Sequence, residues 1–96
     1  MTYNKLLSRE VTIKNDLGIH ARPAAMIAKL AQKAEETIWI ESGDNKADAS
    51  SIIDILSIGG HKDSILKLEV ESENDINLLD SILQLIENGF GENIDE

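Results

Sequence analysis

The sequence contains no cysteine, which excludes disulfides, thiolate metal ligands and cysteine nucleophiles. It has one tryptophan, one tyrosine and one phenylalanine, so leucine, isoleucine and alanine must fill the interior. No run of about eighteen apolar residues is present, so no membrane-spanning helix is predicted. The N-terminus lacks the apolar segment and cleavage site of a signal peptide, and we therefore expect a cytoplasmic protein.

Positive charge is missing from the last third of the chain. The formal net charge is −9, and all nine lysines and arginines lie between Lys5 and Lys67. Nucleic acids and anionic membranes bind through basic patches, so we expect neither as a partner. The length of 96 residues suffices for one modest core, and we expect a single, monomeric domain over 1–96 with flexible ends at 1–5 and 91–96.

Seven segments have the patterns of regular secondary structure. Strands are predicted by β-branched or alternating residues at 6–14, 37–41, 46–48 and 65–71. Three helices are predicted where apolar residues recur at helical spacing. They lie at 24–34, at 51–58 and in a last segment that begins at 72–75 and ends at 88–89. The order βαββαβα predicts an α+β fold, a four-stranded antiparallel sheet with three helices on one face.

The motif Gly-Ile-His-Ala-Arg-Pro-Ala-Ala at residues 18–25 places a histidine where a helix begins. Pro23 fits only the first helical turn, because it has no N–H and its φ is already helical. His20 therefore lies at or just before the N-cap, beside unpaired backbone N–H groups that attract anions. Arg22 adds a guanidinium suited to phosphate oxygens. Such a site can hold a phosphoryl group on the imidazole.

The segment 51–58 has more apolar residues than one buried face can use. Ile55 and Ile58 share one side, and Ile52, Ile53 and Leu56 lie largely on another. We expect part of this second set to face solvent or a partner, with a fully buried helix as the alternative.

These motifs and the order of elements resemble the HPr family, the histidine-containing phosphocarriers of the bacterial phosphoenolpyruvate-dependent phosphotransferase system. The resemblance runs from about Ser8 to Gly89 and includes the residues 18–24 and Ser-Ile-Ile at 51–53 in the family's spacing. It implies an open-faced β-sandwich that carries phosphate stoichiometrically, so the chain is not expected to be an enzyme or to need a cofactor or metal.

The resemblance also implies partners. His20 would accept phosphate on Nδ1 from enzyme I and pass it to an EIIA-type acceptor in sugar uptake, with Arg22 stabilising the phosphate. The partner-binding positions that it implies are Ala21, Ala25, Lys29, Ile52, Ile53 and Leu56. Arg22, Lys29 and Lys33 share one side of the first helix, either as a solvated face or as a basic rim that steers docking onto enzyme I.

Ser51 has two interpretations. In many Gram-positive members of the family the matching serine is phosphorylated by an HPr kinase/phosphorylase, which slows transfer from enzyme I, and the resemblance implies this kinase or a transcriptional regulator as a further partner. Ser51 can equally serve as a helix N-cap, and Asp54 would repel a phosphoserine there, which favours the cap.

One further alternative remains open. Residues 47–53 and 87–90 resemble the nitrogen-related branch of the family, whose members act as regulators through phosphorylation-dependent protein binding. An independent hydrolase or metal enzyme is not supported, because the sequence shows no carboxylate pair, catalytic triad or ligand cluster. His61 lies in a Gly-Gly-His-Lys-Asp loop and is interpreted as an ordinary surface residue.

Overall fold

The computed structural model describes residues 7–92, and this part of the chain forms four strands and three α-helices. They are β1 (Ser8–Thr12), α1 (Ala21–Ala31), β2 (Ile38–Ser42), β3 (Asn45–Asp48), α2 (Ile52–Ile58), β4 (Ile65–Val70) and α3 (Ile76–Glu87). Short 3-10 helices, η2 (Glu73–Asp75) and η3 (Gly89–Gly91), precede and follow α3. None of the helices described is long and apolar enough to cross a membrane.

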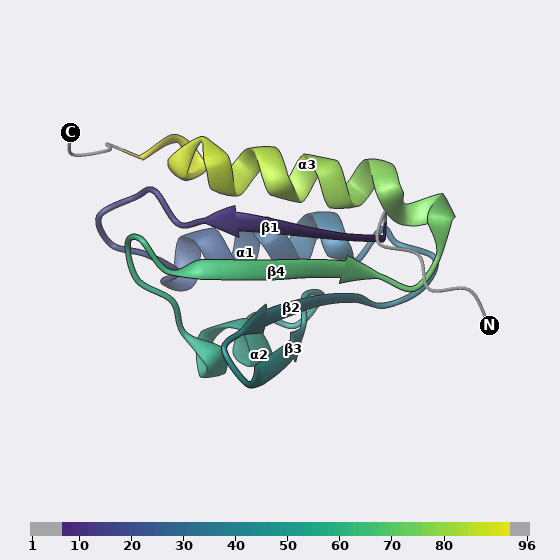
Figure 1. Ribbon diagram of the computed structural model, residues 1–96, viewed down its shortest axis with the longest axis horizontal. Helices are drawn as coiled ribbons and strands as arrows, with labels where there is room; N and C mark the ends of the chain where they lie inside the picture. Colours follow the sequence, from purple (N-terminus) through teal and green to yellow (C-terminus); the bar gives the residue numbers. More distant parts are fainter. Residues whose placement is uncertain (1–6, 93–96) are drawn as a thin grey trace.

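The strands form one antiparallel sheet in the order β1-β4-β2-β3. The helices cover one face of it: α3 packs on β1 and β4, α2 packs on β2 and β3, and α1 packs against both other helices. In Figure 1, α1 lies behind the sheet and α3 runs along its β1 edge. The predicted α+β fold, with its βαββαβα order and open sheet, is confirmed.

The core lies between the sheet and the helices, and its residues follow the predicted periodicities. In β4 the alternating residues Leu66, Leu68 and Val70 are buried, as expected for a strand with one solvated face. Helix α1 was predicted at 24–34, but it begins at Ala21 and ends at Ala31. Gln32 still bonds to the Ala28 carbonyl, and Lys33 and Ala34 then form a turn whose backbone hydrogen bonds span three residues.

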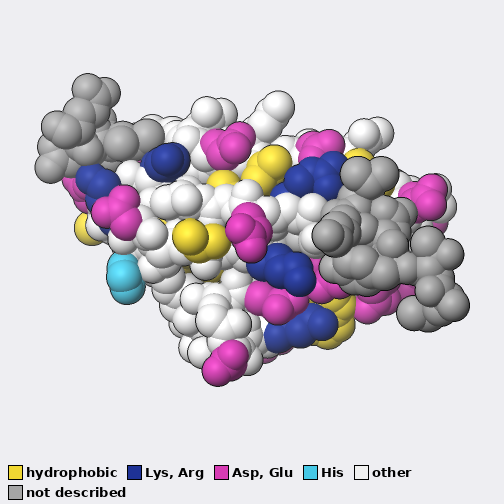
Figure 2. All heavy atoms as spheres, in the orientation of Figure 1, with side chains coloured by type: hydrophobic (Ala, Val, Ile, Leu, Met, Phe, Trp, Pro, Cys, Tyr) yellow, Lys and Arg dark blue, Asp and Glu magenta, His cyan; other side chains and the backbone are white. Residues whose placement is uncertain are grey.

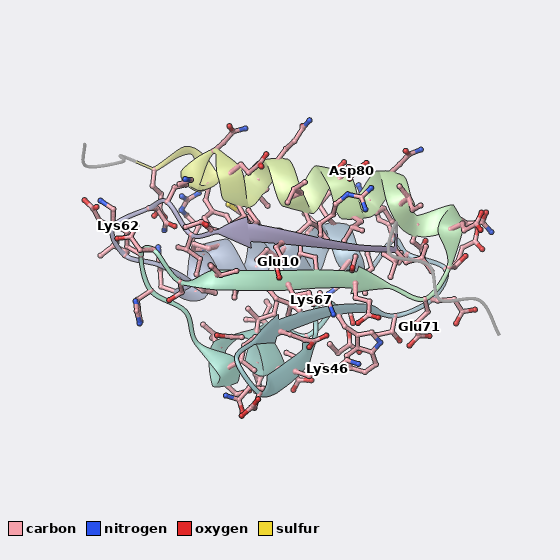
Figure 3. All side chains as sticks on the ribbon, viewed as in Figure 1. Glu10, Lys46, Lys62, Lys67, Glu71 and Asp80 are labelled. Atoms are coloured by element: carbon pink, nitrogen blue, oxygen red, sulfur yellow. The ribbon has the colours of Figure 1, made fainter. Side chains whose placement is uncertain are left out.

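The open face of the sheet carries a row of alternating charge across all four strands. In the strand register, Lys67 on β4 lies opposite Glu10 on β1 and opposite Glu41 on β2. Glu41 in turn lies opposite Lys46 on β3. Figure 3 shows Glu10, Lys67 and Lys46 in sequence across this face, and Figure 2 shows acidic and basic side chains interspersed on it. Opposite charges on facing strand positions stabilise a sheet by about 0.2–1 kcal/mol per pair. The charged side chains on all four strands also indicate that this face of the sheet is solvated.

The chain ends are only partly described. The segment 1–5, expected to be flexible, lies outside the described residues, as do residues 93–96. Of the C-terminal segment 91–96, which was also expected to be flexible, Gly91 ends η3 and Glu92 makes several side-chain hydrogen bonds.

Candidate functional site

His20 is the N-cap residue of α1, as the position of Pro23 predicted. Its backbone is extended, with φ −111° and ψ −168°, and its carbonyl accepts the first helical bond from the Ala24 N–H at 3.0 Å. The imidazole itself does not cap the helix. With 36% of its side chain exposed, the ring can be reached by a partner, and the positive end of α1 lies beside it.

The loop before His20 is held against the loop that follows α2. The Ile19 N–H donates to the Gly60 carbonyl at 2.9 Å, and the Lys62 Nζ donates to Asp16 Oδ1, also at 2.9 Å. Lys62 is labelled at the end of the molecule in Figure 3. The buried Asn15 donates through Nδ2 to the Gly18 carbonyl at 2.8 Å, closing the turn from within. These hydrogen bonds hold the loop in place and so determine the position of His20 at the start of α1.

A residue that the sequence analysis missed, Glu92, lies in contact with both predicted site residues. Its Oε2 atom is 2.8 Å from His20 Nε2, 2.7 Å from Arg22 Nη2 and 3.2 Å from Arg22 Nε. Its Oε1 atom accepts from Asn15 Nδ2 at 2.8 Å. Arg22 Nη2 also donates to the Phe90 carbonyl at 2.9 Å. The structure therefore brings His20 and Arg22 together around one carboxylate.

The surroundings of Glu92 favour its charged form. Burial of the carboxyl raises its pKa, but hydrogen bonds from Arg22, Asn15 and His20, in that order, and the charge of a protonated His20 lower it by more. The net result is a pKa below the ordinary glutamate value. Glu92 thus supplies negative charge directly beside Arg22 at neutral pH.

A left-handed turn after α3 brings Glu92 to this position. Gly89, Phe90 and Gly91 have φ values of 65°, 59° and 74°, all in the left-handed region. That conformation costs a non-glycine residue on the order of 1 kcal/mol or more, and burial of the Phe90 ring, 2% exposed, offsets it. The available sequence signal was a single phenylalanine between two glycines directly after an amphipathic helix.

The predicted partner-binding residues lie exposed on two helices that pack against each other. On α1 these are Ala21, Ala25 and Lys29. On α2, Ile53 is 78% exposed, and Ile52 and Leu56 are 39% and 40% exposed. Ile55 is fully buried on the same helix, so the expected division into a core side and an outer side is confirmed, and the alternative of a fully buried helix is wrong.

The sequence analysis missed two other exposed apolar side chains. Leu17, in the loop before His20, is 72% exposed, and Ile65, at the start of β4, is 61% exposed. Lys29 and Lys33 line one shallow hollow with Met26, Leu30 and Leu85, so these lysines share a side of the molecule as expected.

Ser51 is the N-cap of α2, and its Oγ accepts from the Asp54 N–H at 3.2 Å. The predicted capping role is therefore confirmed. His61 is exposed, and its Nδ1 lies 3.1 Å from the Lys62 carbonyl and 3.2 Å from Ser64 Oγ within its own loop. Within residues 7–92, no group of acidic and histidine side chains is arranged to hold a metal ion.

Comparison with known proteins gives consistent matches over most of the chain. Residues 7–88 match a family model described as the phosphotransferase-system HPr component phosphorylation site. The chain is 32% identical over 87 residues to the phosphocarrier protein HPr of Cupriavidus necator, covering 91% of this chain and 98% of that protein. It is 35% identical over 86 residues to the phosphocarrier protein NPr of Shewanella violacea, covering 90% and 94%. Among solved structures, HPr of Thermoanaerobacter tengcongensis superimposes with a TM-score of 0.84 at 36% identity, over 91% of this chain and 98% of that one.

Proposed function

The chain belongs to the HPr family of phosphotransferase-system phosphocarriers, and we propose that His20 is the residue that carries its phosphoryl group. One observation supports this most directly. His20 is a half-exposed N-cap whose Nε2 is bonded to Glu92, while its Nδ1 makes no hydrogen bond to any residue of the described part. The Arg22 guanidinium lies beside it, joined to the same Glu92 carboxylate.

Phosphoryl acceptance at this position needs few groups. The lone pair of Nδ1 attacks phosphorus, and the new N–P bond forms as the bond between phosphorus and the donor breaks. The N–H groups at the start of α1 and the guanidinium of Arg22 stabilise the negative charge on the phosphoryl oxygens. No general base is required, because Nδ1 carries no proton when Nε2 holds it. Transfer onward is the same step in reverse, with an acceptor as nucleophile.

The donor in this proposal is phospho-enzyme I, and the acceptor is an EIIA-type protein of sugar uptake in the cytoplasm. The apolar side chains Ile52, Ile53 and Leu56 would dock these partners, with Ala21 and Ala25 contributing small contacts near His20. Lys29 would meet an acidic partner surface, and its charge would raise the rate of association.

A regulatory role in the nitrogen-related branch is the second candidate. It is favoured by the similarity to the NPr protein of Shewanella violacea and by the Glu-Asn-Gly-Phe segment at 87–90. In that role the phosphorylation state of His20 would control binding to a target. Ser51, already engaged as a cap beside Asp54, is a weaker candidate for a kinase site or for regulator docking.

The direct test is incubation with phosphoenolpyruvate, Mg²⁺ and enzyme I from either branch, followed by intact mass measurement. We expect the addition of one acid-labile phosphate that is lost in His20→Ala and retained in Ser51→Ala. His61→Ala is the matched control, since it removes the other histidine, which lies in an exposed loop. Preference for one enzyme I identifies the branch, and absence of labelling with both would refute the carrier role.

A further inference from the structure

Two segments of the chain, the turn at 89–91 and the loop that contains Asn15, hold the Glu92 carboxylate in place. The left-handed residues 89–91 lead the chain from the end of α3 to Glu92, and the buried Phe90 anchors that turn. From the other side, Asn15 is fully buried and its Nδ2 donates to both the Gly18 carbonyl and Glu92 Oε1. Asn15 thereby joins the turn before His20 to the chain after α3.

Asn15 holds this position at a cost. Its Oδ1 atom is buried and has no hydrogen-bond partner within the described residues. An unpaired buried oxygen is unfavourable, because it has lost its hydrogen bonds to water. An aspartate at position 15 would place a second carboxylate against Glu92, whereas the Asn15 amide donates hydrogen bonds to both Gly18 and Glu92. Glu92 is therefore one of the two acceptors that hold the Asn15 side chain in its buried position.

The contact with His20 selects one form of the imidazole. An ionised carboxylate can only accept a hydrogen bond, so the Nε2 atom, 2.8 Å from Glu92 Oε2, must carry the proton. In a neutral ring the lone pair then lies on Nδ1. The contact also fixes the rotation of the ring, because Glu92 is itself held by Arg22 and Asn15.

We propose that Glu92 is a positioning residue for phosphoryl acceptance: it holds His20 in the Nε2–H tautomer, with Nδ1 turned toward the incoming phosphoryl group, and it orients Arg22 beside that group. The proposal rests on the function proposed above for His20. Glu92 does not touch the phosphorus, and it acts through His20 and Arg22. A carboxylate that orients a functional imidazole in this way is familiar from metal sites and from hydrolytic triads.

The test compares Glu92→Ala with Glu87→Ala, which removes the same charge from an exposed position at the end of α3. Imidazole ¹⁵N shifts at pH 8, where a histidine is ordinarily neutral, report the tautomer without any partner protein. We expect a single Nε2–H form with a protected proton in wild type and Glu87→Ala. Glu92→Ala should show a mixture of both tautomers and a rapidly exchanging proton.

The kinetic arm measures the rate of His20 phosphorylation by enzyme I at saturating and limiting carrier concentration. We expect a loss on the order of tenfold in the maximal rate for Glu92→Ala, with a smaller change in apparent affinity. Glu92→Gln keeps an acceptor oxygen and should recover part of both the rate and the single tautomer.

The outcomes are distinguishable. Equal tautomer populations and equal rates in Glu92→Ala and Glu87→Ala would overturn the positioning role while leaving the carrier function intact, and so would a faster Glu92→Ala. Failure of wild-type protein to accept phosphate from either enzyme I would refute the proposed function, and the tautomer measurement would still decide whether Glu92 orients the ring. Thermal unfolding of each variant confirms that it is folded.

Discussion

Gly18 and Gly60 are in direct backbone contact, and this contact sets the position of His20. A Cβ atom placed on Gly18 would lie 2.4 Å from the Gly60 carbonyl oxygen and 2.8 Å from the His61 Cα. The same Gly60 oxygen accepts the Ile19 N–H at 2.9 Å. The turn that carries the histidine is therefore pressed against the loop after α2, with no room for a side chain.

Gly18→Ala should destabilise the protein by about 3 kcal/mol, from left-handed backbone strain and from overpacking against the Gly60 carbonyl. Gly43→Ala is the matched control: its φ of 61° resembles the 65° of Gly18, but a Cβ there meets nothing within 4 Å. It should cost only about 1 kcal/mol, the strain alone. Urea denaturation of both variants measures the difference, and equal losses would argue that the close contact carries no energetic weight.

The contribution of Glu92 to stability should disappear in acid. Its pKa is lowered in the folded state, so its stabilisation is fully present above the unfolded value of about 4.3 and is lost as the pH falls through the lower folded pKa. Wild type should exceed Glu92→Gln by on the order of 1 kcal/mol at pH 7, since the partner Arg22 is half exposed. Urea unfolding from pH 7 to pH 3 follows the gap, which should close in acid. A gap that widens in acid contradicts the assignment.

Ile53→Ser should weaken partner binding without unfolding the protein. The side chain is 78% exposed, so its loss should change stability by no more than about 0.5 kcal/mol. If α2 docks partners, affinity for enzyme I should fall roughly tenfold or more in a titration. Ile65→Ser is the control, because Ile65 is 61% exposed but lies at the start of β4. Equal affinities for the two variants would remove α2 from the docking surface.

Ser51→Ala should lower stability by about 1 kcal/mol, because the Asp54 N–H loses its partner at the start of α2. Ser51→Asp keeps a capping oxygen and should recover most of that loss despite the neighbouring Asp54. Thermal unfolding compares the two. If alanine unfolds at the same temperature as wild type, the hydroxyl is not a cap in solution, and a regulatory role for Ser51 gains weight.

Features that depend on near neighbours in the chain could be predicted from the amino-acid sequence. Pro23 restricts the start of α1 to the residues around His20, and the alternation of Leu66, Leu68 and Val70 assigns the buried face of β4. The uneven apolar content of α2 predicted an exposed side that includes Ile53. These inferences succeed because steric limits and the periods of helix and strand act over a few residues.

The contacts between distant segments could be recognised only in the folded structure. Glu92 lies 72 positions after His20, and nothing local to either residue indicates their contact. It arises because the left-handed residues around the buried Phe90 direct the chain after α3 along the start of α1, where Arg22 Nη2 donates to the Phe90 carbonyl at 2.9 Å. The contact between Gly18 and Gly60 likewise joins two loops that are far apart in the sequence. Such contacts depend on how whole elements pack, and no short stretch of sequence encodes that.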